Sequence, residues 1–443
     1  MRLWWPKIAL LLLLVMIYIG AAGSLWYLVD QGVIEQTRIP GEVVDPRVYI
    51  VEQAELDASL NAARSYMHEA LIREDGHVYL VVSPNRTSPV NDRATNSEAV
   101  SYALLWSALL ADKDTFDTTL DYIEEQMIHP TFGYLMWRLN EESQAVGDGE
   151  HIATDADLRS IRALFIAREH WPDERYERLI DDLADGIERV AITPHGTMAP
   201  YAYISDGIAY TSEETWLSYA DFEAYDLLAH RRGEPWESVK QNMKRHSLEA
   251  QLPSGFFYTA VTREGQYSNK LDNGSFSVNM FWLIERSAQS NDPELRRAAQ
   301  EALDVLETRY LQDTELYAHY DRLGNAISPR ADAPWVYPLI GRAAIALDNL
   351  ALANDMVREI IAAQADNGGI YEGGAYSPRV TQFTHQESII TLAMYDEYIR
   401  EKRIRGELID PDDVAPVRES FRSRLSACVN GSSSCWDLLP TPP

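Results

Sequence analysis

Two acidic residues stand in the first turn of a strongly patterned helical segment, within the stretch Ala153–Leu158. A third acid, Glu98, directly follows Ser97 at the equivalent point of an earlier segment. Carboxyl groups that share one cleft can act as a proton donor and a base, and hydrolysis of a glycosidic bond requires that pair. Glu98 and Asp155 are therefore the leading catalytic candidates.

Helix capping offers a structural explanation for several of these acids. A carboxylate in the first turn of a helix is stabilised by the helix dipole, by about 0.3–1 kcal/mol. The Thr-x-x-Asp or Thr-x-x-Glu spacing of a capping box predicts capping roles for Asp157, Glu214 and Glu387. Glu98 and Asp155 directly follow the expected caps Ser97 and Thr154, so their side chains are free to point into a cleft.

The position of Glu98 creates a conflict between structure and chemistry. A helix N-terminus lowers the pKa of a carboxyl group, whereas a general acid must keep its proton near neutral pH. Burial or a neighbouring anion reverses that shift. We expect Asp155 to be this neighbour, so that replacing Asp155 by Asn lowers the pKa of Glu98.

Apolar residues at three- and four-residue spacing predict a chain built almost entirely of helices. The expected spans are 51–72, 97–112, 114–127, 154–170, 173–190, 213–232, 235–250, 276–290, 293–310, 335–348, 351–365 and 384–401. Only short hairpin pieces are expected at 78–82 and 256–261.

Very short connections alternate with long loops along this series, which pairs the helices into six hairpins. Closed in a ring, six hairpins form an all-α (α/α)6 barrel. The N-termini of the inner helices, near 97, 154, 213, 276, 335 and 384, then meet at one mouth. A superhelical solenoid is the alternative, but it requires a fixed sequence repeat, and we find none.

The N-terminus predicts a membrane anchor. Residues 1–7 include Arg2 and Lys7, and the uncharged run 8–29 has 22 residues, enough to span a membrane. Basic residues before the span place the N-terminus in the cytoplasm and the rest outside the membrane, periplasmic or extracellular. A cleaved signal peptide ending near Ala21–Gly23 is the alternative.

The remaining domain boundaries follow from composition. Residues 30–50 are expected to form a tether, residues 51–405 the barrel, and residues 406–443 a tail. The only two cysteines, Cys428 and Cys435, predict a small disulfide loop in that tail.

The net charge of −29 argues against nucleic-acid binding, which requires a basic face. The sequence contains no Gly-x-Ser-x-Gly elbow, no His-Glu-x-x-His pair and no phosphate-binding glycine loop. We expect neither a metal nor a cofactor. His385 falls at the predicted mouth and is expected to be a structural histidine.

Several of these segments resemble glycoside hydrolase family 8, the endoglucanase, xylanase and chitosanase family. Ser97–Leu105 is similar to the family's Ser-Glu-Gly-Gln-Ser-Tyr-Gly-Met segment, and Gly133–Arg138 to its Gly-Leu-Phe-x-Trp-Arg. Ala153–Asp157 matches Ala-Thr-Asp-Ala-Asp, and Leu217–Tyr219 resembles a later Pro-Ser-Tyr-Phe. The matches cover roughly residues 90–290.

The resemblance implies an (α/α)6 barrel and an inverting mechanism. It makes Glu98 the general acid and Asp155 the acid that contacts the sugar. The sequence also offers aromatic candidates for sugar binding, which are Tyr102, Trp137, Tyr219 and Trp335.

One departure concerns the base, which the family often carries in Asp-Ala-x-Arg. The corresponding region, Asp272–Asn279, lacks that motif. Asp272 is the candidate base, with Glu213 or Glu214 as alternatives. Two hypotheses follow. The first is a membrane-tethered, exported glycosidase that cuts internal bonds of a β-linked polysaccharide, with an exopolysaccharide made by the same cell as the candidate substrate. The second is a non-catalytic glycan-binding or scaffold protein of a polysaccharide export system.

Overall fold

The computed structural model describes residues 50–82, 93–327, 334–370 and 380–408. The predicted span 8–29, most of the tether and the Cys428–Cys435 loop lie outside these ranges. Within them, no helix is both long and apolar enough to cross a membrane. All described residues belong to one compact unit.

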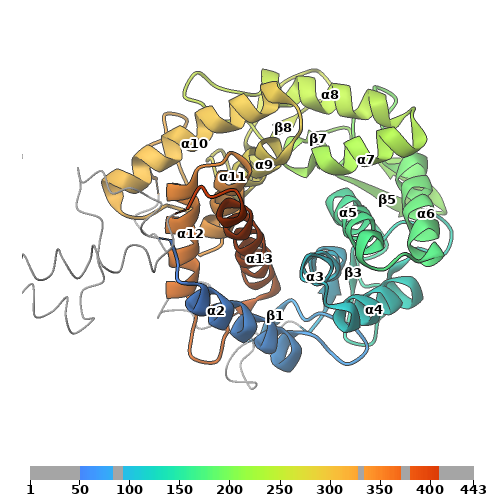
Figure 1. Cartoon of the computed structure of the whole chain (residues 1–443). Helices are drawn as coiled ribbons and strands as arrows, with labels where there is room; N and C mark the ends of the chain where they lie inside the picture. The colour runs from blue at the N-terminus through green and yellow to red at the C-terminus, as the bar shows by residue number, and fades with distance from the viewer. Residues whose placement is uncertain (1–49, 83–92, 328–333, 371–379, 409–443) are drawn as a thin grey trace, which may run out of the picture. The chain divides into compact units, whose positions relative to one another are not determined.

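Six helices form a closed inner ring (Figure 1). They are α3 (Ser97–Leu109), α5 (Thr154–His170), α7 (Phe222–Arg232), α9 (Val278–Gln289), α11 (Val336–Ala346) and α13 (Gln382–Ile404). Each contacts the next, and α13 contacts α3. This last contact closes the circle, so the fold is the predicted (α/α)6 barrel and not a solenoid.

Six further helices surround this ring (Figure 1). They are α2 (Gln53–Tyr66), α4 (Lys113–Tyr122), α6 (Glu174–Val190), α8 (Trp236–Glu249), α10 (Pro293–Asp313) and α12 (Leu350–Ala362). Five inner helices pack on the outer helix that follows them, whereas α13 packs on α2. The first and last described helices therefore form the sixth hairpin.

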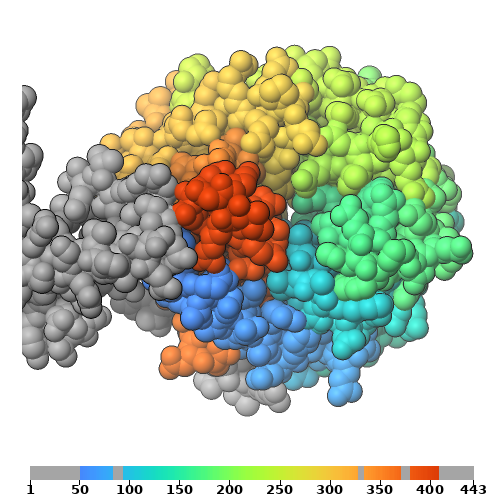
Figure 2. Space-filling view, viewed as in Figure 1, coloured from blue at the N-terminus to red at the C-terminus, as the bar shows by residue number. Residues whose placement is uncertain are grey.

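The two rings differ in sequence because they bury different fractions of their surface. In α3 every residue from Ala99 to Ala108 is buried, so the helix is apolar or small on all sides. In α6 the buried side chains recur every three or four residues, from Tyr176 to Val190, and charged residues fill the outer face. On the face seen in Figure 2, side chains of α13, α3 and α5 close most of the ring's centre.

One helix is shorter than predicted. Residues 213–232 were expected to form one helix, but α7 begins only at Phe222, where Asp221 accepts a hydrogen bond from the Ala224 N–H (3.0 Å). Before it, β7 (Thr215–Trp216) pairs with β8 (Ala260–Val261), and Leu217–Tyr219 forms a 3-10 turn. Strand pairing overrides the helical pattern of this segment.

Short antiparallel strands lie directly ahead of several inner helices. The sheets are β1 (Val81–Val82) with β10 (Val380–Thr381), β2 (Thr95–Asn96) with β3 (Arg138–Leu139), β4 (Ile152–Ala153) with β5 (Tyr201–Ser205) and β6 (Ile208–Thr211), and β7 with β8 and β9 (Tyr267–Ser268). The β5–β6 hairpin was not expected. These strands fix the helix N-termini that carry the candidate acids.

A glycine turn follows every outer helix on the way to the mouth. Each contains a glycine with positive φ and is closed by an isolated β-bridge, for example Ile72↔Val78 around Gly76. The six glycines are Gly76, Gly133, Gly196, Gly255, Gly324 and Gly368. The turn thus recurs in structure, but its glycines are unequally spaced along the chain and form no fixed sequence repeat.

Candidate active site

Glu98 and Asp155 occupy the first turns of the adjacent inner helices α3 and α5. The caps differ from those expected. Asn96, not Ser97, caps α3 by accepting the Ala99 N–H (2.8 Å). Thr154 donates its hydroxyl to the carbonyls of Ala199 (3.0 Å) and Pro200 (3.2 Å). These bonds anchor the start of α5 to the segment that leads into β5.

Glu98 is suited to hold a proton at neutral pH. Burial, and then the negative charge of Asp155, raise the pKa of Glu98 to about 7, although Arg159 acts in the opposite direction. Glu387 also raises this pKa, and Arg286 lowers it. The expected influence of Asp155 on Glu98 is therefore present in the structure.

Asp155 is held by an arginine one helical turn below it. Arg159 donates to Asp155 Oδ2 (3.0 Å), and its Nη1 donates to the Ser101 hydroxyl (2.8 Å). The guanidinium carbon lies 3.7 Å from the centre of the Tyr102 ring, a cation–π contact. Both charges are almost fully buried, so Asp155 has a fixed position.

Glu387 is not the helix cap that its spacing predicted. The helix begins at Gln382, and Glu387 is completely buried in the barrel. It pairs with Arg342 (2.5 Å) and accepts hydrogen bonds from the Tyr102 hydroxyl and from Trp282 Nε1 (3.2 Å). Tyr102, expected to bind sugar, is 3 % exposed and engaged on both sides by this network.

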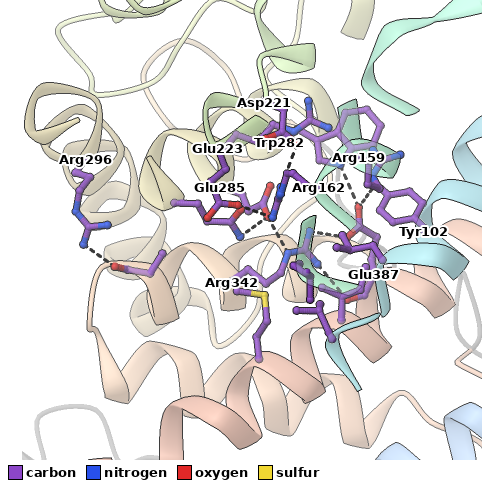
Figure 3. A pocket seen from close by; sticks show the side chains of 18 residues that line it. Tyr102, Arg159, Arg162, Asp221, Glu223, Trp282, Glu285, Arg296, Arg342 and Glu387 are labelled. Carbon is purple, nitrogen blue, oxygen red and sulfur yellow. Dashed lines mark hydrogen bonds and ion pairs between the residues drawn. The ribbon is translucent and has the colours of Figure 1, made fainter. Parts of the chain in front are cut away.

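A cavity of about 330 Å³ is lined by side chains of all six inner helices, among them Tyr102, Arg159 and Glu387 (Figure 3). Arg342 bridges Glu285 (2.8 Å) and Glu387, while Arg162 bridges Asp221 (3.1 Å) and Glu223 (2.5 Å). Although burial opposes it, Arg162 and Arg286 hold the pKa of Asp221 below its usual value. Arg286 also lines the cavity, and its Nη1 is buried without a hydrogen-bond partner among the described residues.

Asp157 is likewise not a helix cap. Its Oδ1 accepts the N–H of Leu135 (2.9 Å), and its Oδ2 is buried without a partner among the described residues. Burial therefore raises the pKa of Asp157 well above its ordinary value. The residue ties the loop after α4 to α5. Glu214, the third expected cap, pairs instead with Lys270.

Asp272 lies in a short 3-10 segment ahead of α9. Asn279 Nδ2 donates to Asp272 Oδ1 (2.9 Å), and Asn279 accepts in turn from the Ser218 hydroxyl (2.8 Å). Oδ2 of Asp272 is buried and has no partner among the described residues, and burial raises the pKa of this carboxyl group. These bonds connect Asp272 to the segment that carries Tyr219.

The aromatic candidates have different surroundings. The Tyr219 ring is partly exposed, and the charges of Asp155 and Glu98 act on its hydroxyl, whose pKa is raised mainly by burial. Its ring contacts those of Trp216 (5.1 Å) and Trp282 (6.5 Å). Trp335, at the start of α11, packs on Phe281, with 5.8 Å between the ring centres. Trp137 lies next to β3, and its backbone carbonyl accepts a hydrogen bond from the Ser97 N–H.

Sequence reasoning missed most of the buried charge network, which includes Arg159, Arg162, Glu285, Arg286 and Arg342. A signal was available, because Glu285-Arg286 interrupts an otherwise apolar helical segment. A charge pair at positions that face a helix core indicates partners on other helices.

Comparison with known proteins agrees with this architecture. The model of the family "Glycosyl hydrolases family 8" matches residues 62–277. An endoglucanase of Escherichia coli O157:H7 is 22% identical over 173 residues, which are 37% of this chain and 46% of that protein. The chain thus aligns with about half the length of this relative.

Solved structures share the fold at low sequence identity. A protein described as a novel alpha-amylase from Clostridium perfringens has a TM-score of 0.64 and 18% identity, over 76% of this chain and 98% of its own. A beta-1,3-1,4-glucanase from Paenibacillus sp.X4 has a TM-score of 0.61 and 15% identity, over 82% and 95% of the two chains. At these identities the likeness concerns the fold.

Proposed function

Because the chain belongs to glycoside hydrolase family 8, we propose that it is a glycosidase that cuts internal bonds of a β-linked polysaccharide. The observation that carries the proposal is the pairing of Glu98 with Asp155 at the mouth of the barrel. One of these carboxyl groups has a pKa of about 7, and the other is fixed by a buried arginine. A general acid beside a fixed carboxylate is the arrangement that glycosidic bond cleavage requires.

In the proposed mechanism Glu98 protonates the oxygen of the leaving sugar. Asp155, held by Arg159, accepts hydrogen bonds from the sugar at the cleavage point and keeps Glu98 protonated before the reaction. Water attacks the opposite face of the sugar ring, which inverts the anomeric centre. An inverting site requires about 6.5–9.5 Å between its two carboxyl groups.

We assign the base to Asp272. Its Oδ2 has no partner among the described residues and is the oxygen left to take a proton from the attacking water, while its other oxygen is fixed by Asn279. A raised pKa makes a carboxylate a better base once it is ionised. Asp272→Asn should therefore lower kcat at least 100-fold without a comparable change in KM.

The proposal includes the location of the enzyme. Residues 8–29 would anchor the chain in the membrane with the barrel outside, within reach of an exopolysaccharide made by the same cell. A proteolysis experiment on intact spheroplasts tests this location: the barrel should be digested from outside, and a protected barrel would contradict it.

The test of activity is a panel of polysaccharides incubated with the full chain and assayed for new reducing ends. The panel includes mixed-linkage β-glucan, carboxymethylcellulose, xylan and chitosan, and also starch, because one similar structure is described as an alpha-amylase. Release by wild type that falls at least 1000-fold in Glu98→Gln supports the glycosidase. Binding without release supports the alternative, a glycan-binding scaffold of an export system.

A further inference from the structure

The β5–β6 hairpin carries an exposed aromatic face that the catalytic proposal does not use. Among the described residues nine large apolar side chains are exposed, and four of them are Tyr201, Tyr203, Ile208 and Tyr210. Tyr203 and Tyr210 pair across the two strands and stack, with ring centres 5.1 Å apart and planes 13° from parallel. A cluster of exposed aromatic side chains on a protein surface indicates a binding site.

The hairpin presents this face in a fixed orientation. Asp206 and Gly207 both have positive φ, the conformation of a two-residue type I′ turn. Side chains alternate along the strands, so Ala202 is buried on the opposite face, where Thr211 donates to the carbonyl of Val190 (2.9 Å) in α6. The tyrosine face therefore stays directed outward.

The hairpin is joined directly to the candidate active site. Tyr201 pairs with Ala153 of β4, two residues before Asp155. From Tyr201 a series of edge contacts continues through Trp216 (5.8 Å) to Tyr219 (5.1 Å). A second row of rings runs from His151, directly before β4, through Tyr203 of β5 (5.8 Å) to Tyr210 of β6. Aromatic rings thus extend from the acids to the hairpin.

The chemistry of the face identifies its occupant. Residues 201–212 contain a single charged side chain, Asp206 at the turn, in a chain with a net charge of −29. Tyrosine rings offer flat apolar area with a hydroxyl at the edge, which suits the apolar faces and hydroxyl groups of sugars. An uncharged ligand that reaches both the hairpin and the acids has to be extended.

We propose that the tyrosine face of β5–β6 binds distal sugar units of an uncharged polysaccharide whose cleaved bond lies at Glu98 and Asp155. This inference rests on the proposed function and adds a second, remote part to its binding surface. It makes activity dependent on chain length, because only a long chain touches both parts.

Kinetics on long and short substrates test the proposal. The substrates are the uncharged polymer of the panel that wild type cleaves best and the shortest oligosaccharide of that polymer that it cleaves. In Tyr203→Ala/Tyr210→Ala the KM for the polymer should rise about tenfold with kcat unchanged, because two stacking contacts are lost. On the oligosaccharide both constants should stay within about twofold of wild type, which also shows that the variant is folded.

Matched variants separate stacking from other effects. Tyr203→Phe/Tyr210→Phe keeps the rings and should retain the wild-type KM. Leu323→Ala removes another exposed apolar side chain, 64% exposed, and should also leave KM unchanged. An unchanged KM for the polymer in the double alanine variant, or an equal loss on both substrates, would overturn the inference.

Electrophoresis through gels that contain each polymer keeps the inference testable if no hydrolysis is found. Retardation of the wild type that is lost in the double alanine variant supports the binding face even though the glycosidase proposal has failed. A wild type that no uncharged polymer retards would refute the binding face.

Discussion

The proton on Glu98 depends on charges that reach it from three other inner helices. Asp155 and Glu387 raise its pKa, and Arg159 and Arg286 lower it, while burial has the largest effect. The outcome, a pKa of about 7, is a property of the assembled barrel. From sequence alone Glu98 and Asp155 could be identified as candidates, but the arginines that face them could not, because their partners lie on other helices.

At this scale the first prediction concerns Asp155→Asn. Removing the negative charge of Asp155 also leaves Arg159 uncompensated, and both changes lower the pKa of Glu98. Activity requires protonated Glu98 and falls as pH rises through its pKa, so the high-pH limb of the kcat/KM profile should move about one pH unit lower. If turnover is too slow, carboxyl ¹³C NMR can follow the titration of Glu98.

Asp157→Asn is the matched control for that experiment. Asp157 lies in the same first turn of α5 but is not among the main causes of the pKa shift of Glu98. In Asp157→Asn the high-pH limb of the kcat/KM profile should stay at its wild-type position. A limb that stays in place in Asp155→Asn, or moves equally in both variants, would contradict the assignment of Asp155.

Among the elements, long helices were predictable and strand-forming loops were not. The bounds of α5 agree with the expected span 154–170, because the pattern of the helix is not disturbed by its neighbours. The segment 213–221 has a helical pattern too, but Thr215 and Trp216 find strand partners at Val261 and Ala260. Such pairing joins residues more than forty positions apart, which no local pattern records.

The β5–β6 hairpin did leave a readable signal. Residues 201–211 alternate Tyr-Ala-Tyr-Ile-Ser and Ile-Ala-Tyr-Thr around Asp206-Gly207, a strong short-range indication of a hairpin. The flanking segments, by contrast, have the apolar spacing of helices. The N-termini of the inner helices other than α7 were thus predictable to within a few residues, while most of the strands that support them were found only in the structure.

The prediction at the scale of the elements concerns the glycine turns, with Gly76 as the test. Its φ is +90°, and a Cβ there would lie 2.4 Å from the carbonyl oxygen of Thr118 in α4 and 2.9 Å from Tyr122 Cβ. Gly76→Ala should therefore lower the free energy of unfolding by about 3 kcal/mol, through backbone strain and this clash. Urea denaturation measures it.

Gly265→Ala separates strain from clash. Gly265 has a similar φ of +79°, but no atom of the described residues lies within 4 Å of its added Cβ. Only the strain of the left-handed conformation remains, so the loss should be about 1 kcal/mol. Equal losses at both positions would show that contact with the next outer helix is unimportant.

At the scale of the whole molecule, α13 and α2 form the hairpin that joins the two ends of the barrel. His385 of α13 is completely buried, and its Nε2 is 2.9 Å from the Ala63 carbonyl of α2. Burial lowers the pKa of His385 to about 4. The expectation of a structural histidine agrees with these contacts.

This histidine should make the closed ring sensitive to acid. In the unfolded chain it takes up a proton near pH 6.5, whereas in the folded chain it does so only near pH 4, so stability is lost as pH falls between these values. Between pH 6.5 and pH 5 the loss is about 2 kcal/mol. His385→Gln should remove that part of the pH dependence, measured by urea denaturation at both pH values.

His195→Gln provides the control for the effect of losing a histidine. His195 is exposed, so its replacement should leave the pH dependence as in wild type. If His385→Gln loses stability in parallel with wild type at both pH values, the acid sensitivity comes from other groups.

The pairing of α2 with α13 also sets the order in which the molecule can form. Ala63 and His385 are 322 positions apart in the sequence. α2 therefore cannot form its contacts with α13 until nearly all of the barrel's chain is available. Without α13, the surfaces of α2 and α3 that it covers would be exposed, and exposed apolar surface promotes aggregation. Glu387 arrives with α13, so Tyr102 and Arg342 lack their shared partner until the circle closes. Folding to completion and assembly of the reactive centre are therefore the same event.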